Sequence, residues 1–172
     1  YRTTVLVPWW PNRGIAPAFN EGVKLAGANV ICWLNSDCLV EPGWELPLID
    51  CATKGLHVAF PWTNGEKSDG VGITGWCFVA TKQTFWRVGA FDETFVPAFY
   101  EDTDWFHRLL AEGGKLWSVP ASRVNHTRGA ERDLLFLANR IRYAWKHKLD
   151  PNEPPFFWKQ PLPEWPPKST AP

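Results

Sequence analysis

A continuous apolar run, Val30-Ile31-Cys32-Trp33-Leu34, is the feature that most constrains what this chain can fold into. It has the length of a β-strand, and a strand buried on both faces has this composition, as in a parallel sheet. Further short apolar runs alternate with amphipathic stretches along the chain, which is typical of α/β domains. The sequence therefore predicts an α/β domain with a mainly parallel central sheet and flanking helices.

The same alternation predicts where each element lies. Strands are expected at residues 4–7, 30–34, 56–61, 75–80, 116–119 and 122–125, and helices at 17–28, 45–53, 82–88, 103–112 and 131–148. Residues 64–72 are rich in Gly, Asp, Ser and Lys and are expected to form a mobile loop. The last helix is expected to be amphipathic, with an apolar stripe on one side made of Leu134, Leu137, Ala138, Ile141 and Trp145.

The chain becomes rich in proline from residue 150 onward. Regular helices and central strands exclude proline at this density. Aromatic residues in the same segment, Phe156, Phe157, Trp158 and Trp165, indicate that its first part packs down. We therefore predict one domain at residues 1–149 and an extended tail at 150–172.

Composition limits the classes of function. The 172 residues suffice for one domain with a sizeable core. A net charge of zero gives no electrostatic case for binding nucleic acid or anionic membranes. No run is long enough to cross a bilayer, and no signal peptide is visible. The cysteines lack C-x-x-C spacing, so free thiols, a cytoplasmic location and no zinc site are expected; they are Cys32, Cys38, Cys51 and Cys77.

Polar residues follow the apolar run directly, as Asn35-Ser36-Asp37. Ligands of open α/β sheets bind beyond the carboxyl ends of strands. Asp37 therefore lies where a metal or phosphate site is expected. A second interpretation stays open, in which Asn35 and Asp37 only form a turn.

Three carboxylates lie within four positions, in the segment Glu101-Asp102-Thr103-Asp104. Like charges this close need a cation, a partner or water to stay ionised. At a helix start, exposed N–H groups and the positive end of the dipole favour them. Arg108 is spaced to pair with Asp104. The segment is either an acidic helix start with a buried face or part of a functional site.

His126 ends the last predicted strand. A lone histidine is more often structural than a ligand, but this one occurs in a chain that already offers Asp37. Twelve tryptophans are many for this length, and exposed aromatic faces also stack on sugar rings. Trp76 and Trp105 are the ones expected near a sugar.

Three segments, in order, resemble the inverting GT-A-fold glycosyltransferases of the family 2 type. The first contains Asn12, Gly14, Asn20, Leu34-Asn35-Ser36-Asp37 and Pro42-Gly43, and is similar to the family pattern N-x-G-x-A-x-A-x-N-x-G … L-N-x-D … P-G. The second contains Gly75-Trp76-Cys77-Phe78 and Val88-Gly89-Ala90-Phe91-Asp92. The third contains Tyr100-Glu101-Asp102-Thr103-Asp104-Trp105, Arg108, Gly113, Val119-Pro120 and His126.

The resemblance implies a compact, GT-A-like (Rossmann-like) fold and transfer of a sugar, with inversion, from a nucleoside-diphosphate sugar to an acceptor hydroxyl. It implies Mn²⁺ or Mg²⁺ held by Asp37 and His126, and Asp102 as general base. The donor side is assigned to Asn12, Gly14, Asn20, Asn35 and Asp37. The acceptor side is assigned to Gly75, Trp76, Glu101, Asp104 and Trp105, with Glu101 and Asp104 orienting the acidic turn.

The chain departs from the family pattern at its start, where only about eleven residues precede Asn12. Family members usually open with two βα units that form most of the nucleotide pocket, so a shortened N-terminal part is expected here. Either a second copy completes the pocket in a homodimer, or the protein is a compact or degenerate member. The alternative function is a non-catalytic protein that binds nucleotide sugars or carbohydrate.

Overall fold

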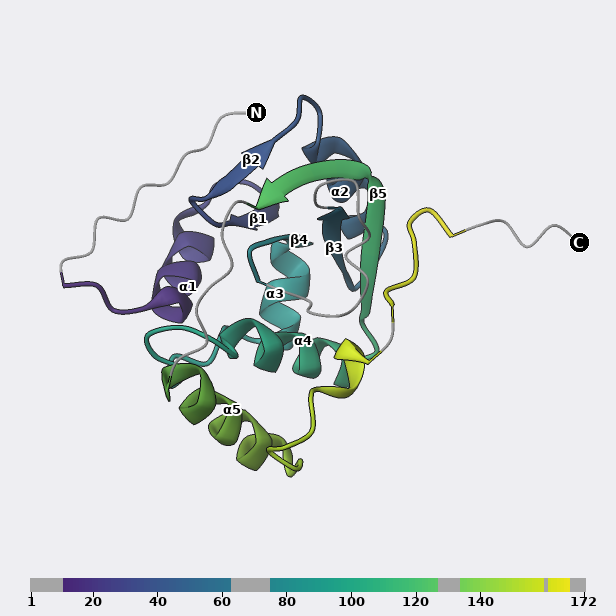
Figure 1. Ribbon diagram of the computed structural model, residues 1–172. Coiled ribbons are helices and arrows are strands. Elements are labelled where there is room, and N and C mark those ends of the chain that lie inside the picture. Colours follow the sequence, from purple (N-terminus) through teal and green to yellow (C-terminus); the bar gives the residue numbers. More distant parts are fainter. Residues whose placement is uncertain (1–10, 63–74, 127–133, 160, 168–172) are drawn as a thin grey trace, which may run out of the picture.

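The computed structural model describes residues 11–62, 75–126, 134–159 and 161–167 (Figure 1). The predicted strand at 4–7 and loop at 64–72 lie outside these ranges. In chain order the elements are α1 (Ile15–Leu25), β1 (Val30–Leu34), β2 (Cys38–Val40), α2 (Glu45–Ala52), β3 (His57–Trp62), β4 (Cys77–Thr81), α3 (Lys82–Val88), α4 (Glu101–Ala111), β5 (Lys115–His126), α5 (Leu134–His147) and the 3₁₀ helix η1 (Phe156–Trp158).

The described strands form a mixed sheet in the order β1-β4-β3-β5-β2. Only β3 and β5 pair in parallel, because β4 runs opposite to both β1 and β3, and β2 runs opposite to β5. The α/β class is confirmed, but the prediction of a mainly parallel sheet is wrong for the described strands. The apolar run behind this prediction, β1, lies at the end of the described strand order and only its Trp33 is buried, so an apolar run does not by itself reveal a parallel sheet.

β5 is one strand of 12 residues, although two short strands were predicted around Pro120. Its first half pairs with β3, and the register shifts after Pro61. Its second half pairs with β2, a short strand that was not predicted, and this pairing places His126 opposite Cys38. The change of partner carries the end of β5 to the turn that follows β1.

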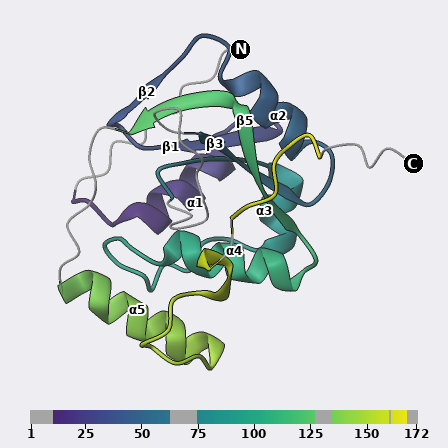
Figure 2. The same ribbon diagram turned by 45° about the vertical axis from the view of Figure 1, so that its right-hand side comes forward.

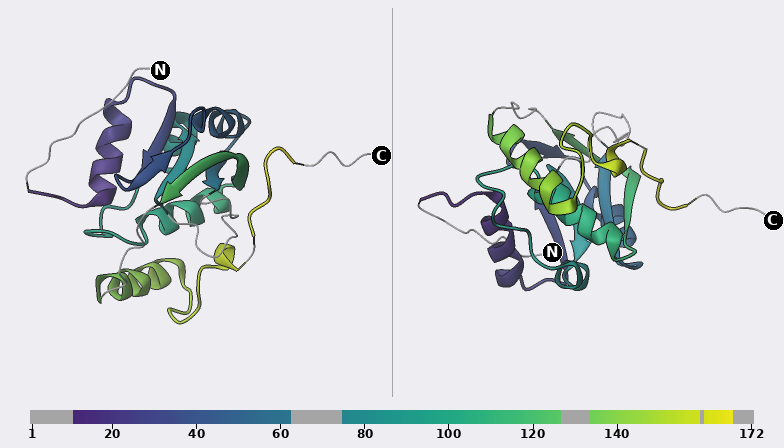
Figure 3. Two further views of the ribbon diagram at one scale, coloured as in Figure 1. Left: turned by 45° about the horizontal axis from the view of Figure 1, so that its top comes forward. Right: turned by 90° about the horizontal axis from the view of Figure 1, so that it is seen from below.

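Helices cover both faces of the sheet (Figures 2 and 3). Successive residues of a strand point to opposite faces of the sheet and so supply two cores. In β3, Val58 and Phe60 join one core, and Ala59 joins the other. α1, α3 and α4 close the first core, and α2 closes the second. α4 lies between the sheet and α5 (Figure 1), so residues at its N-terminus are held from two sides.

The apolar stripe of α5 faces outward rather than into the core. Leu134 is 83% exposed and Trp145 is 77% exposed. The helix instead packs through Phe136, Asn139 and Tyr143 on the loop before α4. No helix among the described residues is long and apolar enough to span a membrane.

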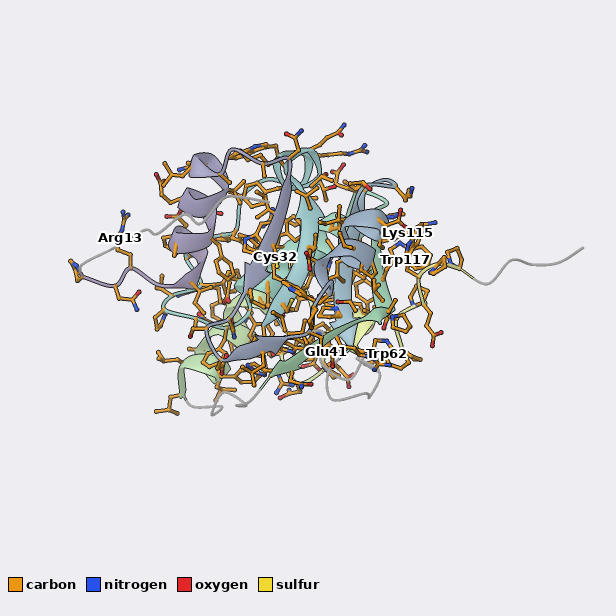
Figure 4. All side chains as sticks on the ribbon, turned by 90° about the horizontal axis from the view of Figure 1, so that it is seen from above. Arg13, Cys32, Glu41, Trp62, Lys115 and Trp117 are labelled. Carbon is orange, nitrogen blue, oxygen red and sulfur yellow. The ribbon has the colours of Figure 1, made fainter. Side chains whose placement is uncertain are left out.

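The proline-rich tail lies along the domain up to residue 167. Phe157 is buried in the main core. Glu164 forms a parallel bridge with Ser118 of β5, and the Trp165 indole donates to Asp50 Oδ2 at 3.0 Å. Lys115 and Trp117 mark the side of the molecule along which the described part of the tail runs (Figure 4). The tail therefore packs as an extended segment, while the boundary after residue 149 stays a prediction.

Candidate active site

The turn after β1 and the end of β5 bring two predicted metal ligands together. His126 Nε2 and Asp37 Oδ1 are 3.2 Å apart, and both side chains keep part of their surface exposed. Cys38 completes a group whose ligand atoms all lie within 4.8 Å of one another. It is the one such group of three or more potential ligands found among the described residues. An oxygen, a nitrogen and a sulfur can therefore approach one cation here.

Trp76 joins these three residues (Asp37, Cys38 and His126, here called the metal corner) to the acidic turn that contains Glu101 and Asp102. Its ring stacks on the imidazole of His126, with ring centroids 5.3 Å apart and 7° between the planes. Its carbonyl oxygen accepts from the backbone N–H of Asn35 at 2.8 Å and from the thiol of Cys38 at 3.6 Å. The residue thus fixes the orientation of His126 and the position of the turn after β1.

Gly75 places the Asp102 carboxyl beside Trp76. The N–H of Gly75 donates to that carboxylate, and a Cβ at Gly75 would lie 2.9 Å from Cβ and Cγ of Asp102. Such a distance is shorter than real contacts allow, so only glycine fits. Thr103 also donates to Asp102 Oδ1, from its N–H at 2.6 Å and from its hydroxyl at 3.2 Å.

The backbone before α4 is strained. Phe99 and Tyr100 have φ values of 75° and 71°, in the left-handed region that bulky residues avoid. Such strain costs about 1–3 kcal/mol per residue and persists only where packing enforces it. Here both rings pack against Phe136 of α5. The packing of α5 therefore holds the turn that presents Glu101 and Asp102.

Glu101 and Asp102 differ in access although they are neighbours. Glu101 is 5% exposed, and its Oε2 atom has no hydrogen-bond partner among the described residues, whereas Asp102 is only partly buried. Burial, reinforced by the nearby charge of Asp102, raises the pKa of Glu101 to about 8. Burial also raises the pKa of Asp102, against the opposing hydrogen bonds from Thr103 and Gly75. Of the two residues, Asp102 is the one that keeps part of its surface exposed.

Two predicted acceptor-side residues lie in the interior instead. Trp105 is fully buried among aromatic rings of the main core, and its indole donates to the carbonyl of Gly89 at 2.8 Å. Asp104 is also fully buried and accepts from Arg108, Lys146 and His147 at 2.8 to 3.0 Å. Trp105 therefore packs in the core, away from the surface where a sugar contact was expected, and Asp104 joins α4 to α5.

Two predicted donor-side residues also have structural partners. The Asn20 amide donates to the carbonyl of Phe91 and to Glu93, and its oxygen accepts from the N–H of Phe91, all at 2.9 Å. A Cβ on Gly14, where φ is 101°, would meet the carbonyl oxygen of Pro97 at 2.8 Å. Both residues therefore hold α1 against the loop before α4.

The remaining predicted residues divide between the corner and its surroundings. The side chain of Asn12 accepts from the N–H of Gly14 at 2.9 Å, in a turn before α1. Asn35, Asp37, Gly75, Trp76, Asp102 and His126 form one connected group. Cys38 is the member that sequence reasoning missed, because the absence of C-x-x-C spacing was read as the absence of a metal role.

The mixed sheet between helices, with a polar corner at the end of β1, matches a GT-A-like fold. A solved structure described as "Crystal structure of GalNAc-T7 with UDP, GalNAc and Mn2+" is similar, with a TM-score of 0.62 and 17% sequence identity. The match covers 78% of this chain and 36% of that one, so this chain spans about a third of the neighbour's length. At this identity the likeness shows the fold alone.

The particular family follows from the sequence match. A family model described as "Glycosyl transferase family 2" matches residues 5–100, which is more than half of the chain. The chain belongs to this family. No curated protein matches the sequence of this chain significantly. The family match ends at Tyr100, so the assignments of Asp102 and His126 depend on the geometry of this chain.

Proposed function

We propose that this chain carries the active site of a metal-dependent glycosyltransferase that moves a sugar from a nucleoside-diphosphate sugar to an acceptor hydroxyl with inversion. One observation carries the proposal: the Asp37–His126 pair and the Asp102 carboxyl meet at Gly75-Trp76. The proposed cation site thus adjoins a carboxyl whose pKa is raised by burial. Family membership and a structural neighbour described with UDP and Mn²⁺ support the reaction class.

Asp102 is the proposed general base. It accepts the proton of the acceptor hydroxyl while that oxygen attacks the anomeric carbon from the face opposite the diphosphate. The bond between the anomeric carbon and the diphosphate oxygen breaks, and the nucleoside diphosphate leaves with that electron pair. A base works best when its pKa lies near the operating pH, and base catalysis contributes about 10²–10⁴-fold. Glu101 is the positioning neighbour, because its own carboxyl is buried.

Asp37 and His126 are the proposed ligands of a divalent cation, Mn²⁺ or Mg²⁺. The donor set fits, since a carboxylate oxygen and an imidazole nitrogen already face each other at 3.2 Å. A bound cation of this kind offsets the negative charge that develops on a leaving diphosphate. Asn35, the proposed donor-side residue of the same turn, donates its backbone N–H to the carbonyl of Trp76, and the ring of Trp76 stacks on His126. The predicted homodimer and the nature of the acceptor stay predictions.

Variants of the acidic turn test the base assignment. Asp102→Asn keeps the shape of the side chain but cannot accept a proton, so turnover should fall by at least about 100-fold with donor affinity nearly unchanged. Glu101→Gln should retain measurable turnover. Glu112→Gln, an exposed change at the end of the same helix, is the matched control and should behave as wild type. Full activity in Asp102→Asn would show that this carboxyl is not the base.

Donor binding tests the cation role separately. Calorimetry with a panel of nucleoside-diphosphate sugars, beginning with UDP-GalNAc, should show binding that requires a divalent cation and is lost in EDTA. Asp37→Ala should weaken this binding by about tenfold or more, while Asp150→Ala, on the exposed tail, should not. Equal donor affinity in EDTA and in Mn²⁺ would contradict the metal site.

A further inference from the structure

Cys38 is the residue at the metal corner that departs from a hard-ligand site. It begins β2, directly opposite His126 in the pairing with β5, and directly follows Asp37 in the chain. The register therefore brings its thiol to the side chains of both proposed ligands. Cys38 is partly buried and lies beside Trp76, whose ring also orients His126.

The distances fit a tetrahedral centre. Zinc bonds of about 2.0–2.1 Å to nitrogen and oxygen place two such ligands about 3.3 Å apart, and a Zn–S bond of about 2.3 Å places sulfur about 3.5 Å from them. Asp37 Oδ1 and His126 Nε2 are already 3.2 Å apart. All three ligand atoms lie within 4.8 Å of one another, so the sulfur needs to move by little more than about 1 Å.

The ligand types bias the choice of cation. Most sites with nitrogen, oxygen or sulfur ligands bind Zn²⁺ more tightly than Mn²⁺, and a soft thiolate widens this difference because Mn²⁺ and Mg²⁺ favour oxygen ligands. Three protein ligands with a fourth position open to water or substrate are the usual arrangement of a catalytic zinc. The open position is where a diphosphate oxygen of a donor would bind.

We propose that Asp37, Cys38 and His126 form a three-ligand site that binds Zn²⁺ more tightly than Mn²⁺, with the Cys38 sulfur as the selecting ligand. This deepens the proposed function by naming the cation preference of the same site, and the sequence-based expectation that the cysteines hold no metal would then be wrong. The site is tested by metal binding alone, so a failure of sugar transfer would leave the result readable.

Titration of the chelator-stripped chain with Co²⁺ tests the sulfur directly. Wild type should develop thiolate-to-cobalt charge-transfer absorption, and added Zn²⁺ should abolish it. Cys38→Ser should remove this absorption. It should also lower Zn²⁺ affinity by at least about tenfold, because losing even a residue that hydrogen-bonds to a metal ligand has an effect of that size. Its Mn²⁺ affinity should change by less than about threefold. Cys32→Ser, an exposed thiol outside the ligand group, is the control and should match wild type.

A measurement on unaltered protein covers the case in which Cys38→Ser fails to fold. Iodoacetamide labelling followed by mass spectrometry should show that Zn²⁺ slows modification of Cys38 by at least about tenfold and leaves Cys32 unchanged. Equal Cys38 labelling with and without Zn²⁺ would overturn the proposal. So would tighter binding of Mn²⁺ than of Zn²⁺ by wild type, or unchanged Zn²⁺ affinity in folded Cys38→Ser.

Discussion

The buried carboxyl of Glu101 should make the stability of this protein fall as the pH rises. Its pKa is raised from the usual 4.5 to about 8, so the folded state holds a proton that the unfolded state releases between these values. The stability that this proton contributes is complete below about pH 4.5 and is lost as the pH rises through about 8. Asp102 has a raised pKa as well and acts in the same direction.

The magnitude follows from the size of the pKa change. Raising a pKa from 4.5 to about 8 corresponds to about 5 kcal/mol when the group is fully ionised. Asp102 titrates beside Glu101, so the two carboxyls share this effect, and we expect Glu101 to contribute about 2–4 kcal/mol. That is a large part of the about 5–15 kcal/mol that stabilises an ordinary domain.

Glu101→Gln tests this reasoning, because the amide keeps the shape and cannot ionise. The free energy of unfolding, measured by urea denaturation, should fall between pH 5 and pH 9 in wild type. In Glu101→Gln this fall should be smaller by about 2–4 kcal/mol. Glu112→Gln, whose carboxyl is exposed, should keep the wild-type slope. Parallel pH profiles of wild type and Glu101→Gln would refute the claim that Glu101 is protonated at neutral pH.

Three further changes separate packing roles from catalytic ones. Gly75→Ala forces a Cβ into the Asp102 carboxyl and should lower turnover by about 100-fold in steady-state assays; unchanged turnover would mean that Gly75 does not position this group. Asp104→Asn removes the buried charge that faces Arg108, Lys146 and His147, so urea denaturation should show a loss of about 3 kcal/mol; a loss below about 1 kcal/mol would remove its role in holding α5. Trp105→Phe should cost about 1–3 kcal/mol of stability without changing the acceptor KM, and a raised KM at unchanged stability would restore the sugar contact.

Several elements could be predicted from the sequence because one local signal determined each. The apolar run of β1 and the amphipathic segment of α3 were predicted with the observed bounds, 30–34 and 82–88. β2 was missed, since three residues are too few to show alternation. Its absence from the prediction also hid Cys38, whose place opposite His126 depends on strand pairing.

Other errors arose because spacing reveals a helix face but not what the face contacts. The apolar stripe of α5 has helical spacing, yet Leu134 and Trp145 face outward. The opposite face is held by polar and aromatic contacts, including the Tyr143 hydroxyl to His107 Nδ1 at 2.7 Å and His147 to Asp104 at 2.8 Å. A buried ion-pair network of this kind depends on residues more than 40 positions apart. Sequence spacing within α4 alone could not reveal it.

The most direct test of the proposed function is the anomeric configuration of a product formed by the wild-type chain. Proton NMR can follow the anomeric proton of the donor and of the product in a sample that contains a nucleoside-diphosphate sugar, an acceptor and a divalent cation. We predict a product whose anomeric configuration is opposite to that of the donor, formed with the cation and not in EDTA. A product that retains the donor's configuration would contradict inversion at the anomeric carbon with Asp102 as the base. Equal product formation in EDTA would contradict a cation role for Asp37 and His126.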